Sequence, residues 1–194
     1  FLLRTMLARI DAITADIDVV QDRIDEQIAP FAATVTRLDE IPGVGVTTAQ
    51  AIIAEVGLDM TRFPTPAHLA SWARFAPGIS ESAGRKKGNS GTGKGNRYLA
   101  GALGEAAVGV RRTDTFLGER YRRIAKRRGK KKAIVAVGRS ILMIVWHLLS
   151  DDDARFVDLG SDYYESRVNL NRRTRNHVRE LQALGYKVTL EPAA

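Results

Sequence analysis

The sequence of 194 residues contains no cysteine. Disulfide bonds and thiolate metal sites are therefore excluded. Its 3 histidines, His68, His147 and His177, do not have the spacing of a metal-binding motif. No phosphate-binding loop of the GxxxxGK-S/T type occurs, and no secretory signal peptide is visible. We therefore expect a cytoplasmic protein that binds no metal ion or other cofactor itself.

Acidic residues are scarce in the middle of the chain. The whole sequence has 30 Lys and Arg against 22 Asp and Glu, which gives a net charge of +8 and a pI of about 10.0. Between Gly84 and Arg139 there are 17 Lys and Arg against 3 Asp and Glu, a local charge of +14. A run of one sign is usually a solvated surface, but an excess of this size repels itself without a polyanion. The charge pattern predicts a nucleic-acid partner.

The segment from Phe75 to Leu99 reads FAPGISESAGRKKGNSGTGKGNRYL. It has little apolar surface to bury, and its glycines are typical of a surface loop. Glycines let backbone N–H groups approach an anion closely, and the neighbouring cations raise the local potential. A mobile basic linker is the alternative interpretation. The loop also carries two serines, Ser80 and Ser82.

This segment resembles the C-terminal domain of one bacterial transposase family, the insertion-sequence family numbered one hundred and ten, which are bridge-RNA-guided recombinases. The resemblance lies in the run after Phe75, in Ser82-Ala83-Gly84, and in Gly95-Asn96-Arg97-Tyr98-Leu99. The middle glycine of the family's Ser-Gly-Gly-like tripeptide is Ala83 in this sequence. The resemblance makes Ser82, rather than Ser80, the candidate nucleophile.

The resemblance implies DNA strand cleavage and exchange through a covalent phosphoserine, directed by a structured guide RNA. The family pairs this domain with an N-terminal RuvC-like domain whose four acidic residues hold Mg²⁺, and those residues are not in this sequence. Because the sequence begins inside a helical pattern, we expect it to be the C-terminal part of a longer protein and to be inactive alone. Basic residues of the loop are candidates to hold the DNA backbone or to stabilise charge on phosphate: Arg85, Lys86, Lys87, Lys94 and Arg97.

A second motif lies between Leu38 and Gly57. The turn Pro42-Gly43-Val44-Gly45 separates two short helical patterns, and it resembles the helix-hairpin-helix motif that holds a DNA phosphate. The turn has little side-chain bulk, and the free N–H groups that begin the second helix face outward toward an anion. We therefore assign Gly43, Gly45 and Thr47 to backbone phosphate contact. An ordinary hairpin of two helices is the alternative.

The first helical pattern has a seven-residue repeat. Apolar residues recur at heptad positions a and d: Leu3, Ile10, Ile17, Ile24 and Phe31, with Met6, Ile13 and Val20. This is the pattern of a coiled coil and predicts a homo-oligomer, whereas a helix packed on its own domain is the alternative. Pro30 is expected to interrupt this helix.

The remaining helices are predicted from caps and apolar stripes. Thr65 is the expected cap of a short helix in which Leu69 and Trp72 face the core, Asn96 caps a helix to Val110, and Thr113 caps a helix to Arg128. The residues from Ala133 to Leu149 are apolar nearly all round and predict a central core helix rather than a membrane span. Further nucleic-acid contacts are assigned to Arg74, Asn96, Arg123, Lys126, Arg127, Lys130 and Lys131.

These patterns predict an all-α protein. We divide it into a coiled-coil helix (1–37), a helical transposase domain (38–150) with the helix-hairpin-helix (38–57) and the serine loop (75–98), and a tail packed on that domain (151–194). Two functional alternatives remain open: a non-catalytic helix-hairpin-helix module that binds nucleic acid and dimerises, and an assembly domain whose charge serves only solubility. No membrane partner is expected.

Overall fold

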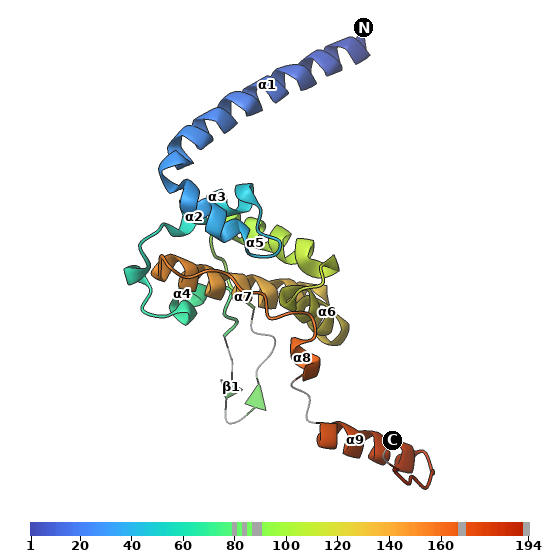
Figure 1. The fold of residues 1–194 in the computed structure, drawn as a ribbon. Helices are drawn as coiled ribbons and strands as arrows, with labels where there is room; N and C mark the ends of the chain where they lie inside the picture. Colours follow the sequence, from blue (N-terminus) through green and yellow to red (C-terminus); the bar gives the residue numbers. More distant parts are fainter. Residues whose placement is uncertain (79–80, 83–84, 87–90, 167–169, 192–194) are drawn as a thin grey trace.

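The computed structural model describes residues 1–78, 81–82, 85–86, 91–166 and 170–191, and for 81–82, 85–86 and 170–173 it describes the backbone only. The protein is all-helical apart from one two-stranded ladder (Figure 1). In chain order the elements are α1 (Leu2–Ile28), η1 (Ala29–Phe31), α2 (Ala32–Asp39), α3 (Val46–Val56), η2 (Met60–Arg62), α4 (Pro66–Trp72), β1 (Glu81–Ser82), β2 (Arg85–Lys86), α5 (Arg97–Gly109), η3 (Val110–Arg112), α6 (Phe116–Arg128), α7 (Lys130–Ser150), α8 (Tyr163–Ser166) and α9 (Leu170–Ala183).

Helix α7 is the centre of the core, as its apolar sequence predicts. It packs against α4, α5 and α6, and α3 covers α5 from the other side. The fully buried side chains of α7 include Val137, Ile141 and Leu142. Within the described residues α7 is also the helix that is long and apolar enough to cross a membrane, with a mean hydropathy of 1.8. Its packed surroundings are those of a core helix.

Two close contacts fix how α7 meets its neighbours. A Cβ atom on Gly138 would lie 2.4 Å from Cε1 of Phe75, so glycine at this position lets the Phe75 ring lie directly against the helix. Phe75 itself is buried. The indole Nε1 of Trp146 donates a hydrogen bond of 2.8 Å to the carbonyl of Phe63. Helix α7 therefore holds both ends of the α4 region in place.

Helix α1 projects from this body, and Figure 1 shows most of its length away from the other helices. None of its residues is buried, and Leu3, Ile10 and Ile17 are more than half exposed. Its C-terminal end is attached to the body, because Gln50 on α3 donates a hydrogen bond of 3.3 Å to Asp25. The helix ends at Ile28, and Pro30 lies in the short 3-10 turn that follows, as predicted.

The start and the end of the helical body are joined by polar contacts. Arg37 on α2 is nearly buried, and its Nη1 donates to the carbonyls of Asp151 at 3.1 Å and Asp152 at 2.8 Å. Its Nη2 donates to the Asp152 carboxylate at 3.0 Å. The backbone N–H of Phe156 donates to the Glu40 carboxylate at 3.1 Å. These bonds satisfy an otherwise costly buried guanidinium.

Three details of the sequence-based prediction were wrong. Thr115, not Thr113, is the N-cap of α6, and its hydroxyl accepts from the Gly118 N–H at 3.1 Å. Trp72 is 43% exposed rather than in the core, although its ring lies 5.4 Å from that of Phe63. Thr65 begins α4 but makes no capping bond, because its hydroxyl is paired with Nδ1 of His68 at 2.8 Å.

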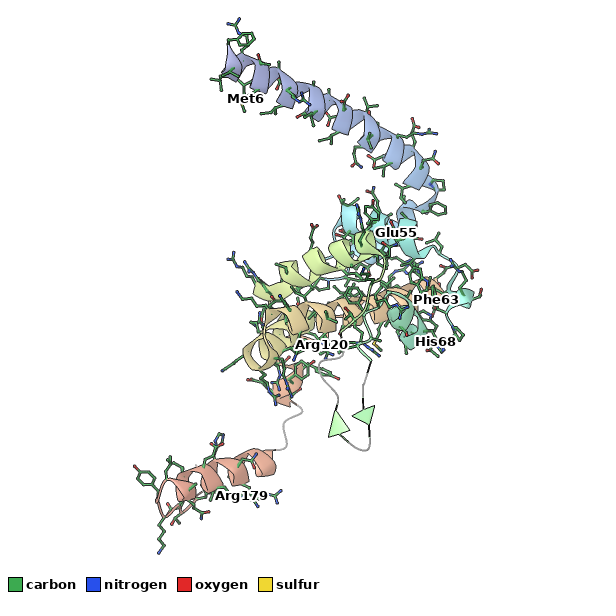
Figure 2. The ribbon with its side chains drawn as sticks, turned by 180° about the vertical axis from the view of Figure 1, so that it is seen from behind. Met6, Glu55, Phe63, His68, Arg120 and Arg179 are labelled. Atoms are coloured by element: carbon green, nitrogen blue, oxygen red, sulfur yellow. The ribbon has the colours of Figure 1, made fainter. Side chains whose placement is uncertain are left out.

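The C-terminal residues divide into two parts. Residues just before and within α8 pack on α6: Asp158 accepts from the Phe116 N–H at 3.1 Å, and the Tyr163 and Tyr164 rings lie 4.9 and 5.4 Å from the Phe116 ring. Helix α9 lies apart from the body in Figure 1, and Arg179 is labelled on it in Figure 2. The domain bounds assigned from sequence stay a prediction.

Candidate nucleic-acid interface

The hairpin turn between α2 and α3 is closed by local hydrogen bonds. The Ile41 N–H donates to the Leu38 carbonyl at 3.1 Å, and the Val44 N–H to the Ile41 carbonyl at 2.9 Å. Gly45 is the N-cap residue of α3 and supplies no side-chain cap. The first N–H groups of any helix lack an intrahelical acceptor, so those of α3 remain available next to the exposed Thr47.

The two glycines of this turn have different surroundings. Gly43 has φ of +85°, and a Cβ there would lie 2.5 Å from both the Ala106 carbonyl oxygen and Cγ1 of Val110. A Cβ on Gly45 would meet nothing within 4 Å. Gly43 is therefore needed for packing against α5, whereas Gly45 lies where a ligand can approach.

Helix α5 begins at the end of the serine loop with a cap on Asn96. The Asn96 Oδ1 accepts from the Tyr98 N–H at 2.9 Å and the Leu99 N–H at 3.1 Å, which confirms the predicted cap. Its Nδ2 donates to the carboxylate of Glu55, which Figure 2 labels at the end of α3. Both polar groups of the Asn96 side chain are thus used within the fold, so a phosphate contact by Asn96 stays a prediction that competes with these bonds.

Basic residues gather where the serine loop returns to the body. Arg74 has φ of +62°, and its side chain lies over the backbone of Gly95: a Cβ on that glycine would be 2.9 Å from Arg74 Cγ. Lys94 is exposed between the glycines that Arg74 covers. Arg97 is exposed too, with its guanidinium carbon 4.9 Å from the centre of the Tyr98 ring. The structure thus brings Arg74 to the same end of the loop as Lys94 and Arg97.

Helix α6 presents a second group of cations. Arg123, Lys126 and Arg127 line one shallow depression with Glu119 and Arg122. Arg122 is committed to the fold, because it pairs with Glu119 at 3.2 Å and donates to the Thr113 carbonyl at 2.9 Å. Arg123 lies over the Tyr164 ring at 4.6 Å. Lys126 and Arg127 are exposed, as is Lys130 at the start of α7.

A groove with a volume of about 560 Å³ runs between α6 and α7. We call it the α6–α7 groove, and its lining includes the two ends of the serine loop. Its apolar residues are Phe75, Pro77, Ile124, Val135 and Ala136; its cationic residues are Arg120, Arg128, Lys131, Lys132 and Arg139; Gly91 and Thr92 complete it. No acidic side chain lines this groove within the described part of the chain.

Of these cations, only Lys131 was assigned from the sequence. Arg120, Arg128, Lys132 and Arg139 were not assigned as contacts, although all four belong to the basic stretch that predicts a nucleic-acid partner. A signal was present: Arg120, Ile124 and Arg128 follow each other at intervals of four, and Lys132, Ala136 and Arg139 continue at intervals of four and three. That spacing places each set on one face of a helix.

Arg120 has the most constrained position in the groove. Its Nη1 donates to the Tyr164 hydroxyl at 2.9 Å. Its Nε is buried and has no hydrogen-bond partner among the residues that the structure describes. Figure 2 shows Arg120 at the edge of the helical body from which the loop bearing β1 and β2 departs. A buried N–H donor without a partner is costly.

The predicted nucleophile is described by its backbone. Ser82 ends β1 and is paired with Arg85 in the antiparallel ladder, while Glu81 is paired with Lys86. The side chains of Ser82, Arg85 and Lys86 lie outside the described residues, as do Ser80 and Lys87 entirely. Their roles stay predictions. Among the described side chains, no cluster of three His, Asp or Glu residues that could hold a metal ion occurs.

Part of the chain is similar to known proteins. Residues 35–122 match the model of a family described as Transposase IS116/IS110/IS902. This stretch is similar to a domain of that transposase family. It is also 34% identical over 133 residues to the "Insertion element IS110 uncharacterized 43.6 kDa protein" of Streptomyces coelicolor (strain ATCC BAA-471 / A3(2) / M145). That alignment covers 68% of this chain and 30% of the relative.

The transposase family match covers most of the candidate interface. It begins in α2 and ends within α6, so it includes the hairpin turn, the serine loop and α5. Helix α7 and 7 of the 12 residues that line the α6–α7 groove lie beyond it. The family match therefore spans the loop and the turn, whereas the groove is assigned from this structure.

Proposed function

We propose that this chain is the DNA-binding and strand-exchange part of a transposase, and that Ser82 forms a covalent link to DNA. The observation that carries the proposal is the transposase family match across residues 35–122, which contain both the hairpin turn and the serine loop. The cations around the loop ends support it, because they would neutralise the phosphates of a strand held at the base of the loop that carries Ser82.

In the proposed step, Ser82 Oγ attacks the scissile phosphorus. An Oγ–P bond forms and the P–O bond to the leaving sugar breaks, with the serine proton and the electron pair of the broken bond ending on the leaving hydroxyl. Serine is a weak nucleophile at its free pKa, so its surroundings must activate it and stabilise the phosphoryl charge. Arg85, Lys86 and Lys87 follow Ser82 closely in the chain and are the nearest candidates for that stabilisation.

The wider assembly belongs to the same proposal. A RuvC-like domain would hold Mg²⁺, a structured guide RNA would direct the target choice, and the reaction would take place in the cytoplasm. The exposed heptad row of α1 would join two or more copies. Neutralisation of backbone phosphates by the hairpin turn and α6 would position DNA without reading its sequence.

The test uses the full-length transposase with its guide RNA and target DNA. Wild-type protein should give a protein–DNA adduct that survives a denaturing gel, and Ser82→Ala should give none. Affinity should change little, because one surface hydroxyl contributes at most a modest hydrogen bond. Ser80→Ala is the matched control and should keep the adduct.

Two results would change the assignment. An adduct that persists in Ser82→Ala and disappears in Ser80→Ala would move the nucleophile to Ser80. An adduct kept by both variants would end the phosphoserine mechanism. The second candidate function would then stand: a non-catalytic module that grips nucleic acid through its cations and dimerises through α1, whose apolar row is exposed.

A further inference from the structure

The α6–α7 groove combines two kinds of surface that rarely occur together on a solvated face. Its apolar part comes from three separate segments, with Phe75 and Pro77 at the start of the serine loop, Ile124 on α6, and Val135 and Ala136 on α7. The cations lie on both helices around this apolar part, with Arg120 and Arg128 on α6 and Lys131, Lys132 and Arg139 on α7. A simple phosphate-binding surface has no need of the apolar residues.

A nucleobase carrying its own phosphates matches both surfaces. The faces of a base are apolar and its edge is polar, while each neighbouring phosphate carries a negative charge. The groove volume of about 560 Å³ falls within the range of small-ligand sites, roughly 300–1,000 Å³. Thr92 lines the groove and offers a neutral hydroxyl to a base edge.

The groove lies at the base of the serine loop, which relates the bound base to the proposed reaction. Pro77 and Gly91 line it, so the two ends of the serine loop leave the body there. A base inside the groove would hold its strand at the root of that loop. Bases in a stacked duplex cannot enter such a recess, so the occupant must be unstacked, as it is at a bulge, a gap or a strand end.

We propose that the α6–α7 groove receives one unstacked nucleobase, with the flanking phosphates held by the cations of α6 and α7. The inference rests on the proposed nucleic-acid function and adds the substrate class of a specific site. Unstacking costs least where a base is already unpaired, so the groove selects distorted or single-stranded positions over continuous duplex.

The experiment compares three DNA duplexes of one sequence with the full chain: fully paired, with a one-nucleotide adenine bulge, and with an abasic bulge at the same position. All three are measured by fluorescence anisotropy in one buffer. The adenine bulge should bind at least about fivefold more tightly than the abasic bulge, since stacking and burial of one base are worth that much in other single-strand sites. A ribonucleotide bulge in a fourth duplex tells whether an RNA or a DNA base is preferred.

A variant that fills the α6–α7 groove tests whether the adenine preference arises there. Ala136→Leu adds apolar bulk inside the groove and no charge, so it should bring the affinities for the adenine bulge and the abasic bulge to the same value. Ala100→Leu, on the exposed side of α5, is the matched control and should keep the preference.

The outcomes separate this inference from the function on which it rests. Equal affinity of wild-type protein for adenine and abasic bulges overturns the groove assignment while nucleic-acid binding stands, and this comparison needs no variant to fold. A preference that survives Ala136→Leu places the base elsewhere and also overturns it. Absence of binding to all four duplexes removes the proposed nucleic-acid function and the inference together.

Discussion

Replacement of Gly138 by alanine tests whether the contact between α7 and Phe75 holds the core and the groove together. The new Cβ would lie 2.4 Å from Phe75 Cε1, and the ring is buried with 7% exposure, so it has little room to move away. Overpacking of this kind costs about 1–3 kcal/mol. Against this, alanine gains about 1 kcal/mol over glycine in a helix interior. The difference between the two effects is a net loss of stability of about 0–2 kcal/mol.

The assay is denaturant unfolding followed by tryptophan fluorescence, which the half-buried Trp146 beside the core should report. Gly101→Ala on α5 is the control, because a Cβ there meets nothing within 4 Å and only the helix-propensity gain should remain. The double variant Gly138→Ala/Phe75→Leu should be more stable than the sum of the single changes by about 0.5–3 kcal/mol, since the smaller side chain relieves the clash. Equal behaviour of Gly138→Ala and Gly101→Ala would refute the reasoning, and so would additive changes in the double variant.

Three further predictions concern binding and assembly. Log affinity for duplex DNA should fall with log salt at a slope of about −5 if about six phosphates are neutralised, and a flat response would reject the phosphate-binding surface. Gly45→Val should fold normally and weaken binding to DNAs of different sequence about equally, and a loss at only one DNA sequence would contradict backbone contact. Gly43→Val should instead lower the unfolding midpoint, because its side chain collides with α5. Ile17→Asp places a charge in the heptad row and should dissociate the oligomer, as measured by light scattering. Val19→Asp, which is similarly exposed but lies off that row, should leave the oligomer intact. A monomeric wild-type chain would end the coiled-coil hypothesis.

The parts of the fold that were predictable depend on local sequence. Apolar residues nearly all round predict helix α7, an apolar stripe predicts α3, and the Asn96 cap predicts the start of α5. The α6 cap shows the limit. Thr113 and Thr115 are both good capping residues, and the choice depends partly on Asp158, which accepts from the first N–H of the helix from 42 residues away. Such a contact has no local signature.

The parts of the candidate site that lie in one short stretch of sequence could be predicted, and the parts assembled from distant segments could not. The serine loop and the hairpin turn are short motifs and could be recognised from their residues. The α6–α7 groove could not, because it exists only once Phe75, Ile124 and Ala136 come together from three segments. Gly43 shows a related difficulty: its place in the motif suggested a phosphate contact, and only the packing against Ala106 gives it a structural role.

The bonds that link Arg37 and Glu40 to residues 151–156 place the entrance and the exit of the helical body side by side. Adjacent ends make a body of this kind easy to insert into another chain or to permute circularly. They also decide how it responds to tension. If α1 and the C-terminal tail are pulled apart, the force acts first on the hydrogen bonds of Arg37 and Glu40. These bonds connect the residues where the two pulled segments join the helical body. The helices around α7 are under tension only after these hydrogen bonds have broken. The contacts between the two ends can therefore break while the core stays folded.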